Sequence, residues 1–141
     1  MTRKIAVRLK QIENLTKERV SQVQRKVFFE LSKQIINMTP VDTGRARANW
    51  QGNVNGFKPG EVKLQQNQRL GREASASVAE ASVLAAMAVH DHGDSLNLGN
   101  NLEYIEFLDK GSSTQAPAGI VDVALNNFRP LVHIEAAKVN R

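Results

Sequence analysis

The sequence predicts a single α+β domain in which a small, mostly antiparallel sheet packs against a long N-terminal helix and a C-terminal helix. Three observations predict this class. Apolar residues recur at helical spacing through residues 1–38, short segments near residues 50 and 96 alternate as strands do, and helical spacing returns after Gly119. The chain has 141 residues, the size of one domain, and contains no internal repeat. Residues 1–141 are therefore expected to form one domain.

The first predicted element is one long helix within residues 1–38. Neither Gly nor Pro occurs before Pro40, which disfavours the helical conformation at Thr39 and ends the helix near Met38. Successive residues are about 100° apart on a helix. The stripe that should face the core is Ile5, Leu9, Ile12, Val20, Val23, Val27, Leu31, Ile35 and Met38.

The other face of this helix is predicted to be a subunit interface. Of the net charge of +5, residues 1–38 carry nine cations and three anions, so the basic character belongs to this segment. Apolar residues lie among these cations, as in contact surfaces with a charged rim. The predicted interface is Leu15, Arg25, Lys26, Phe29, Lys33 and Ile36. The alternative is that these are single exposed apolar residues without a function.

The middle of the chain predicts a strand and a long loop. Asp42 or Thr43 can cap a short helical turn, and alternation from Trp50 to Val54 indicates a strand. A return strand is expected at Val62 and Leu64. Residues 57–73 lack periodicity and are expected to form an extended loop.

Two helices and a strand are predicted next. Ser77 and Glu80 form a capping-box pattern, which places the start of a helix at Ser77 and its end near His90. A short strand follows at residues 95–98. Asn100 or Asn101 should cap the next helix, whose inward residues would be Leu102, Ile105 and Leu108, with Lys110 and Gly111 at its end.

The last helix is expected from about Gly119. Its apolar face would include Ile120, Val121 and Phe128. Pro130 should kink or split it, because the proline ring clashes with the carbonyl of Asn126.

No constellation of residues predicts catalysis. Cysteine is absent, which excludes disulfides and thiolate chemistry, and no nucleophile motif or phosphate-binding loop occurs. His90, Asp91, His92 and Asp94 resemble a metal site, but a polar helix end explains them more simply. Glu103 and Glu106 are expected on a solvated face, and His133 stands alone. We expect no enzymatic activity, no catalytic residue, no metal and no cofactor.

The composition predicts a soluble protein. The longest apolar run, Val83 to Val89, is far shorter than the roughly 18 residues of a membrane-spanning helix, and no secretion signal begins the chain. No membrane partner is therefore expected. The basic charge raises nucleic acid as a partner without establishing it.

Three blocks of sequence, in order, carry a resemblance. Residues 39–50 read Thr-Pro-Val-Asp-Thr-Gly-Arg-Ala-Arg-Ala-Asn-Trp, and residues 93–104 hold Gly-Asp, a strand and Asn-Asn-x-x-Tyr. Residues 108–121 hold Leu-Asp-Lys-Gly-Ser followed by Gln-Ala-Pro-Ala-Gly-Ile-Val. Together they resemble the tail-completion and neck proteins of tailed bacteriophages, the family that includes lambda-type minor tail protein Z. The matched positions are Thr39, Pro40, Val41, Asp42, Thr43, Gly44, Arg45, Trp50, Asn100, Asn101, Tyr104, Gly111, Gln115, Ala116, Pro117 and Gly119.

The resemblance implies a structural virion protein with no catalytic position. Such proteins form a ring, commonly of six subunits, at the head–tail junction. The implied partners are copies of the chain, the connector or stopper, the tail terminator or tube, and genomic DNA passing through the lumen without being read. The implied location is the neck or proximal tail of the virion, and the host cytoplasm during assembly. Ala46 and Asn97 depart from the family pattern. A tail terminator ring and a basic nucleic-acid-binding protein are the alternatives.

Overall fold

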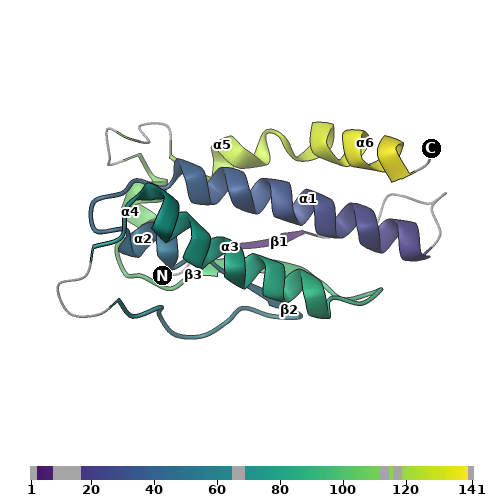
Figure 1. The fold of residues 1–141 in the computed structure, drawn as a ribbon. Coiled ribbons are helices and arrows are strands. Elements are labelled where there is room, and N and C mark those ends of the chain that lie inside the picture. The colour runs from purple at the N-terminus through teal and green to yellow at the C-terminus, as the bar shows by residue number, and fades with distance from the viewer. Residues whose placement is uncertain (1–2, 8–16, 65–68, 112–114, 116–118, 140–141) are drawn as a thin grey trace.

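Nine short elements make up the part of the chain that the computed structural model describes, which is residues 3–7, 17–64, 69–111, 115 and 119–139. Mixed helix and strand confirm the predicted α+β class (Figure 1). The elements are β1 (Arg3–Val7), α1 (Lys17–Met38), α2 (Arg45–Ala48), β2 (Gln51–Val54), α3 (Arg72–Val89), β3 (Leu96–Asn100), α4 (Ile105–Asp109), α5 (Val121–Leu125) and α6 (Phe128–Val139).

The sheet has three strands in the order β1-β3-β2, and both pairs are antiparallel. In its register, Leu98 of the central strand lies between Ile5 of β1 and Gly52 of β2. All five residues of β3 are buried, as expected for a central strand covered by a helix. The predicted small antiparallel sheet is confirmed.

The start of the chain differs from the prediction. Residues 3–7 form a strand, so one helix over residues 1–38 is wrong there, and the long helix α1 begins at Lys17. A segment of five residues that contains the β-branched Ile5 and Val7 is compatible with a strand as well as with a helix. Its pairing with β3 favours the strand. The predicted core positions Leu9 and Ile12 lie outside the described residues.

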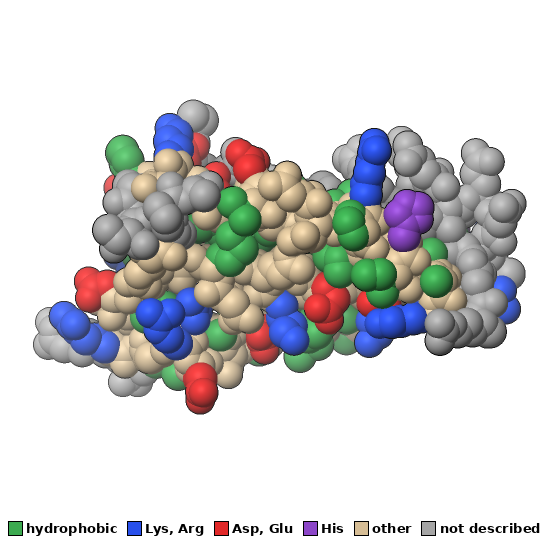
Figure 2. All heavy atoms as spheres, turned by 90° about the horizontal axis from the view of Figure 1, so that it is seen from above, with side chains coloured by type: hydrophobic (Ala, Val, Ile, Leu, Met, Phe, Trp, Pro, Cys, Tyr) green, Lys and Arg blue, Asp and Glu red, His purple; other side chains and the backbone are tan. Residues whose placement is uncertain are grey.

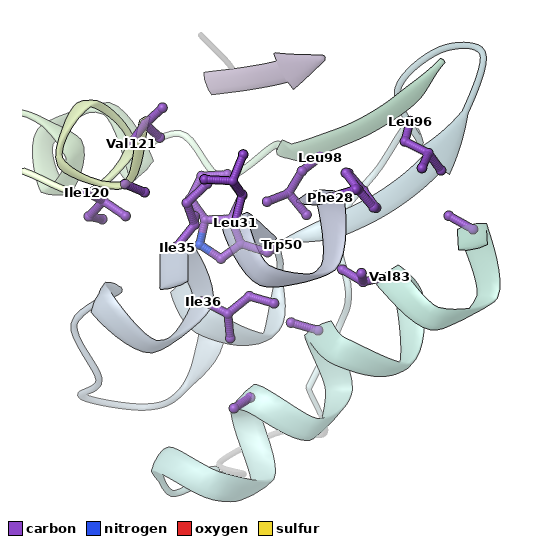
Figure 3. Close-up of a cluster of buried hydrophobic side chains, with 14 of the residues drawn as sticks. Phe28, Leu31, Ile35, Ile36, Trp50, Val83, Leu96, Leu98, Ile120 and Val121 are labelled. Atoms are coloured by element: carbon purple, nitrogen blue, oxygen red, sulfur yellow. The ribbon is translucent and has the colours of Figure 1, made fainter. Parts of the chain in front are cut away.

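The hydrophobic core lies around α1 (Figure 3). Four residues of the predicted stripe, Val23, Val27, Leu31 and Ile35, are buried, which confirms the core-facing side of this helix. Trp50, Leu96 and Leu98 complete the core from the sheet side. In Figure 1, α5 and α6 lie on one side of α1, and α3 lies on the other. The fold is therefore layered about a central helix.

Helix α3 begins at Arg72, five residues before the predicted start. Ser77 lies in its second turn, so the capping-box prediction is wrong, and the loop ends at Gly71 rather than at residue 73. This helix packs along β2, where a Cβ on Gly52 would lie 2.9 Å from the Cα of Val83. The backbone N–H of Gly52 donates to Ser82 Oγ at 3.0 Å. Glycine at position 52 thus permits the close approach of helix and strand.

Val62 and Leu64 are not in a strand, which corrects the predicted return strand. The side chain of Asn49 takes the place of a strand partner there. Its Oδ1 accepts from the N–H of Val62 at 2.6 Å, and its Nδ2 donates to the carbonyl of Val62 at 3.0 Å. The buried side-chain amide of Asn49 therefore satisfies the backbone N–H and carbonyl of Val62 in the loop.

The C-terminal segment is split, as predicted. Helix α5 ends at Leu125, and α6 begins at Phe128, which puts Pro130 in the first turn of α6. A proline is tolerated there because the first turn has no partner for its missing N–H. Within the described residues, no helix is long and apolar enough to cross a membrane.

Candidate functional site

The first block, residues 100–104 of the second block and the described residues of the third block meet at one end of the molecule, formed by α2, α4 and the C-terminal end of α1 (Figure 1). The start of the second block lies elsewhere, because the carbonyl of Asp94 accepts a hydrogen bond from Gln24 near the other end of α1. We call this region the motif end. It comprises residues 39–50, residues 100–104, Gly111, Gln115 and Gly119. Ala116 and Pro117 lie outside the described residues.

Thr39 and Trp50 close the first block on itself. The Thr39 hydroxyl donates to the carbonyl of Ile35 at 2.7 Å and accepts from the indole N–H of Trp50 at 2.7 Å. Both side chains are fully buried. A buried indole N–H needs a partner, so this hydrogen bond fixes the chain reversal between α1 and β2.

Arg47 is a buried cation at the centre of the first block. Its guanidinium donates to the carbonyls of Thr39 (2.9 Å and 3.2 Å), Asn37 (2.8 Å) and Arg72 (3.3 Å). Burial lowers the pKa of Arg47, and the nearby charge of Arg72 lowers it further. Because the guanidinium lies at the C-terminal end of α1, the helix dipole favours its charge. The sequence alone does not predict this role, because the acceptors lie in two separate segments, one at Asn37 and Thr39 and one at Arg72.

Asn100 and Asn101 join the second block to the first. Asn100 is fully buried, donates to the carbonyl of Ala46 at 2.9 Å and accepts from the N–H of Leu102 at 3.1 Å. Asn101 donates to the carbonyls of Lys58 and Gly60 at 2.9 Å and 2.7 Å. Asn100 was expected to cap α4, but the N-cap residue of this helix is Tyr104. Asn100 and Asn101 therefore act mainly by hydrogen-bonding separate segments to each other.

Gln115 joins the third block to the first. Its Oε1 accepts from the N–H of Val41 at 2.9 Å, and its Nε2 donates to the carbonyl of Val41 at 3.2 Å. One side-chain amide thus pairs with a backbone unit 74 residues away in the way that a neighbouring strand would.

Two glycines at the motif end have backbone conformations that other residues rarely adopt. Gly44 has φ +84° and lies against the carbonyl of Leu70, and Gly119 has φ +89° and lies against the carbonyl of Asp109. Asp109 in turn accepts from the N–H of Val121 at 2.8 Å. A Cβ at either glycine would overlap a backbone oxygen, so the close turns require glycine.

The exposed rim of the motif end contains the charged residues Asp42, Arg45 and Glu61 and the aromatic residues Tyr104 and Phe107. Arg45 forms an ion pair with Glu61 at 2.7 Å, and Asp42 lies in the solvent 3.8 Å from Arg69. Burial raises the pKa of Tyr104, while the charge of Arg45 opposes that shift. Phe107 of α4 is 65% exposed. This rim can contact a protein partner through an aromatic side chain surrounded by charges.

The predicted subunit interface on α1 does not form an open face. Ile36 is fully buried and lies between α1 and α3 (Figure 3), so it belongs to the core. Phe29 is partly buried and packs on the core, with Lys33 Nζ 5.4 Å from the centre of its ring. Arg25 contacts His90, Lys26 is exposed, and Leu15 lies outside the described residues. The prediction is wrong for Ile36 because α3 covers this side of the helix.

His90 is a structural contact between helices. Its Nδ1 lies 3.2 Å from Arg25 Nη1, and its Nε2 lies 3.1 Å from Gln24 Oε1 and 3.2 Å from the carbonyl of Asp94. Since a guanidinium only donates, Nδ1 accepts and Nε2 carries the proton. Burial lowers the pKa of His90, consistent with a neutral ring.

The other residues tested for chemistry are dispersed. His92, His133 and Glu103 are exposed, and Asp94 accepts from Asn55 at 2.8 Å. Within the part of the chain that the structure describes, no three side chains of the metal-binding types gather.

No protein-family model, curated protein or solved structure matches this chain.

Proposed function

We propose that this chain is a structural virion protein of a tailed bacteriophage, a tail-completion or head–tail joining protein. Six copies form a ring at the junction of connector and tail, in the neck or proximal tail. The ring is built in the host cytoplasm during assembly. The proposal joins the resemblance of three sequence blocks to the place that these blocks occupy in the fold.

The convergence of the three blocks is the observation that carries the proposal. The first block precedes the other two by more than 40 residues. Asn100 nevertheless hydrogen-bonds to the carbonyl of Ala46, and Gln115 hydrogen-bonds to the backbone of Val41. The hydrogen bonds between these blocks at the motif end explain why residues far apart in the sequence belong to one sequence pattern. Side chains that hydrogen-bond to backbone carbonyls and N–H groups fix the conformation of the motif end. A fixed conformation suits a surface that must make the same contact in every copy.

The rim of the motif end supports protein partners for this role. Tyr104 and Phe107 expose aromatic surface, while Arg45, Glu61 and Asp42 supply charges around it. Aromatic residues with a polar rim are typical of protein–protein contacts. On this proposal, the motif end contacts the connector or stopper on one side, or the terminator or tube on the other.

The exposed cations of α1 support a weak contact with passing DNA. Lys17, Arg19 and Lys26 are exposed on this helix. Lysine and arginine bind phosphates without reading bases. The genome would therefore pass such a lumen without being recognised.

Particles assembled without this chain test the proposal. We expect DNA-filled heads and separate tails by electron microscopy, and restored joining when the chain is supplied from a plasmid. Normal yields of infectious particles would exclude the proposal. Abnormally long tails would assign the chain to the tail terminator instead.

A binding assay separates the proposal from a basic nucleic-acid-binding protein. The purified chain should bind duplex DNA weakly, and 200 mM salt should remove the binding, as for about two or three phosphate contacts. Tight binding that depends on the sequence of the duplex would favour the alternative function.

A further inference from the structure

We infer that the outer face of α3 packs against the outer face of α6 on a neighbouring copy of this chain. The inference deepens the proposed function and rests on it, because it names the contact that builds the ring. The α3 outer face is Ala74, Ser77, Val78, Ala81, Leu84, Ala85, Ala88 and Val89. The α6 outer face is Arg129, Pro130, His133, Ile134, Ala137 and Lys138.

Helix α3 carries apolar side chains on its outer face as well as on its inner face. Its inner residues, Ala76, Ala79, Val83 and Ala86, belong to the core. Its outer face repeats at spacings of three and four residues, with Leu84 50% and Val89 70% exposed. Between Ala74 and Val89, Glu80 is the one charged residue. Large apolar side chains left open beside one another are typical of a surface that another protein covers, so the outer face of α3 is suited to a protein contact.

The charges beside the α3 outer face select the partner. Glu73 and Glu80 are seven residues apart, so they lie two turns apart along the same edge. This acidic edge repels nucleic acid and anionic membranes. It favours an apolar surface that has cations beside it.

The α6 outer face has that chemistry. Ile134 is 51% exposed, and Pro130 and Ala137 are exposed on the same helix. Arg129 and Lys138 add two cations, while the acidic residue of this helix, Glu135, is buried and bonds to Lys138 at 3.3 Å. Figure 2 shows hydrophobic side chains open on the face of the molecule that includes α5 and α6, with both cationic (Lys, Arg) and acidic (Asp, Glu) side chains among them.

The two faces cannot meet within one copy. Helices α3 and α6 lie on opposite sides of α1, with α6 packed on α1 from the side away from α3 (Figure 1). Contacts between different faces of identical subunits repeat head to tail, and they close into a ring when the rotation allows it. A contact of α3 with α3 would leave the α6 face uncovered.

The size of the contact favours a ring over a dimer. Helix α3 has 18 residues and α6 has 12, so they are about 27 Å and 18 Å long. One such helix pair buries well under the roughly 800 Å² per partner that stable complexes need. In a closed ring each copy makes two of these contacts, so the release of one copy requires losing two contacts rather than one.

Engineered cysteines test the contact, because the natural chain has none. We would place Ala81→Cys and Ala137→Cys together in the full chain, supply it to particles that lack the natural chain, and oxidise the purified particles. The double variant should give a ladder of cross-linked copies. Each single variant should stay uncross-linked.

A second variant measures the contribution of the apolar face. Leu84→Glu should lower incorporation into particles about tenfold or more, because it buries an unpaired charge. Gln22→Glu makes a similar change at an exposed position of α1 and should incorporate normally. Circular dichroism of both purified variants shows that each is folded.

Each outcome decides the inference. Dimers from Ala81→Cys alone would show an α3–α3 contact and overturn the inference. So would particles that contain the double variant, join normally and show no ladder, while the proposed function would stand. Absence of the natural chain from purified particles would overturn the proposed function, and the ring contact with it.

Discussion

At the scale of single residues, Arg47 holds the end of α1 to the start of α3. Its guanidinium donates to the carbonyls of Asn37 and Thr39 at the end of α1 and to the carbonyl of Arg72 at the start of α3, and its side chain is buried. Burying such a cation without a carboxylate is tolerated because the helix end and the carbonyls supply negative potential. The residue is therefore a requirement of the fold rather than a contact for a ligand.

Replacing Arg47 with Lys should lower the free energy of unfolding by about 3 kcal/mol. A single ammonium cannot reach all three carbonyls, and unsatisfied buried groups cost about 1–3 kcal/mol each. Chemical denaturation of the purified chain measures this change. Arg45→Lys is the matched control, since the exposed pair with Glu61 contributes about 1 kcal/mol or less. Equal losses in the two variants would contradict the role assigned to Arg47.

His90 predicts a pH dependence of stability. Burial lowers its pKa below the ordinary 6.5, Arg25 acts in the same direction, and Asp94 and Asp91 oppose the shift. The unfolded chain therefore takes up the proton first as the pH falls. The histidine costs no stability above pH 6.5, and stability is lost as the pH falls through that value toward the folded pKa.

Thermal unfolding of the natural chain and of His90→Gln between pH 7.5 and pH 5 checks this expectation. The loss of stability on acidification should be smaller in the variant, because glutamine does not titrate. His92→Gln removes an exposed histidine and should leave the pH dependence unchanged. Parallel curves for the natural chain and His90→Gln would contradict the prediction.

At the scale of elements, α1 shows why two apolar faces on a helix need not mean an intermolecular contact. The sequence predicted one buried stripe correctly, and Val23, Val27, Leu31 and Ile35 are buried. It could not show that α3 covers the neighbouring side of α1, because helical spacing within one segment contains no information about its partners. Ile36 was therefore assigned to a subunit interface although it lies in the core.

Ile36→Ala should lower the free energy of unfolding of the isolated chain by about 2–5 kcal/mol, as for other buried aliphatic residues cut to alanine. Phe29→Ala should cost less, because that ring is only partly buried. Denaturant titration of both variants gives the comparison. If Ile36→Ala kept full stability and only failed to enter particles, the residue would belong to an interface after all.

Other elements show where local patterns were sufficient and where they were not. Alternation of apolar and polar residues predicts the strands β2 and β3. The chemistry of proline predicts the break between α5 and α6 near Pro130. The strand at residues 3–7 and the coil at Val62 depend on distant partners, β3 and the amide of Asn49. Short apolar segments take the conformation that their tertiary partners require.

At the scale of the whole molecule, the sequence indicated which residues form the candidate site but not that they lie together. Gln115 was indicated by the resemblance alone, whereas Asn100 was also expected as a helix cap and Thr39 as the residue that follows the long helix. The fold brings their segments to one end. The exposed face of α3 could not be predicted, since only the packing of β2 and α1 shows which half of an apolar helix remains open. Assembly surfaces therefore become visible only after the core is known.

Charge reversal gives the last prediction, at the level of the ring. Glu73→Lys with Glu80→Lys should lower incorporation into particles about threefold to tenfold, because two rim pairs contribute about 0.2–1 kcal/mol each. Arg129→Glu should also lower incorporation, and Lys138 is left unchanged because it pairs with the buried Glu135 at 3.3 Å. A chain that carries all three changes has opposite charges across the contact at position 129 again and should regain part of the lost incorporation. High salt should reduce these differences, since Glu73 and Arg129 are exposed. Additive losses in the triple variant would contradict a contact between α3 and α6, because only faces that meet in the ring can compensate each other.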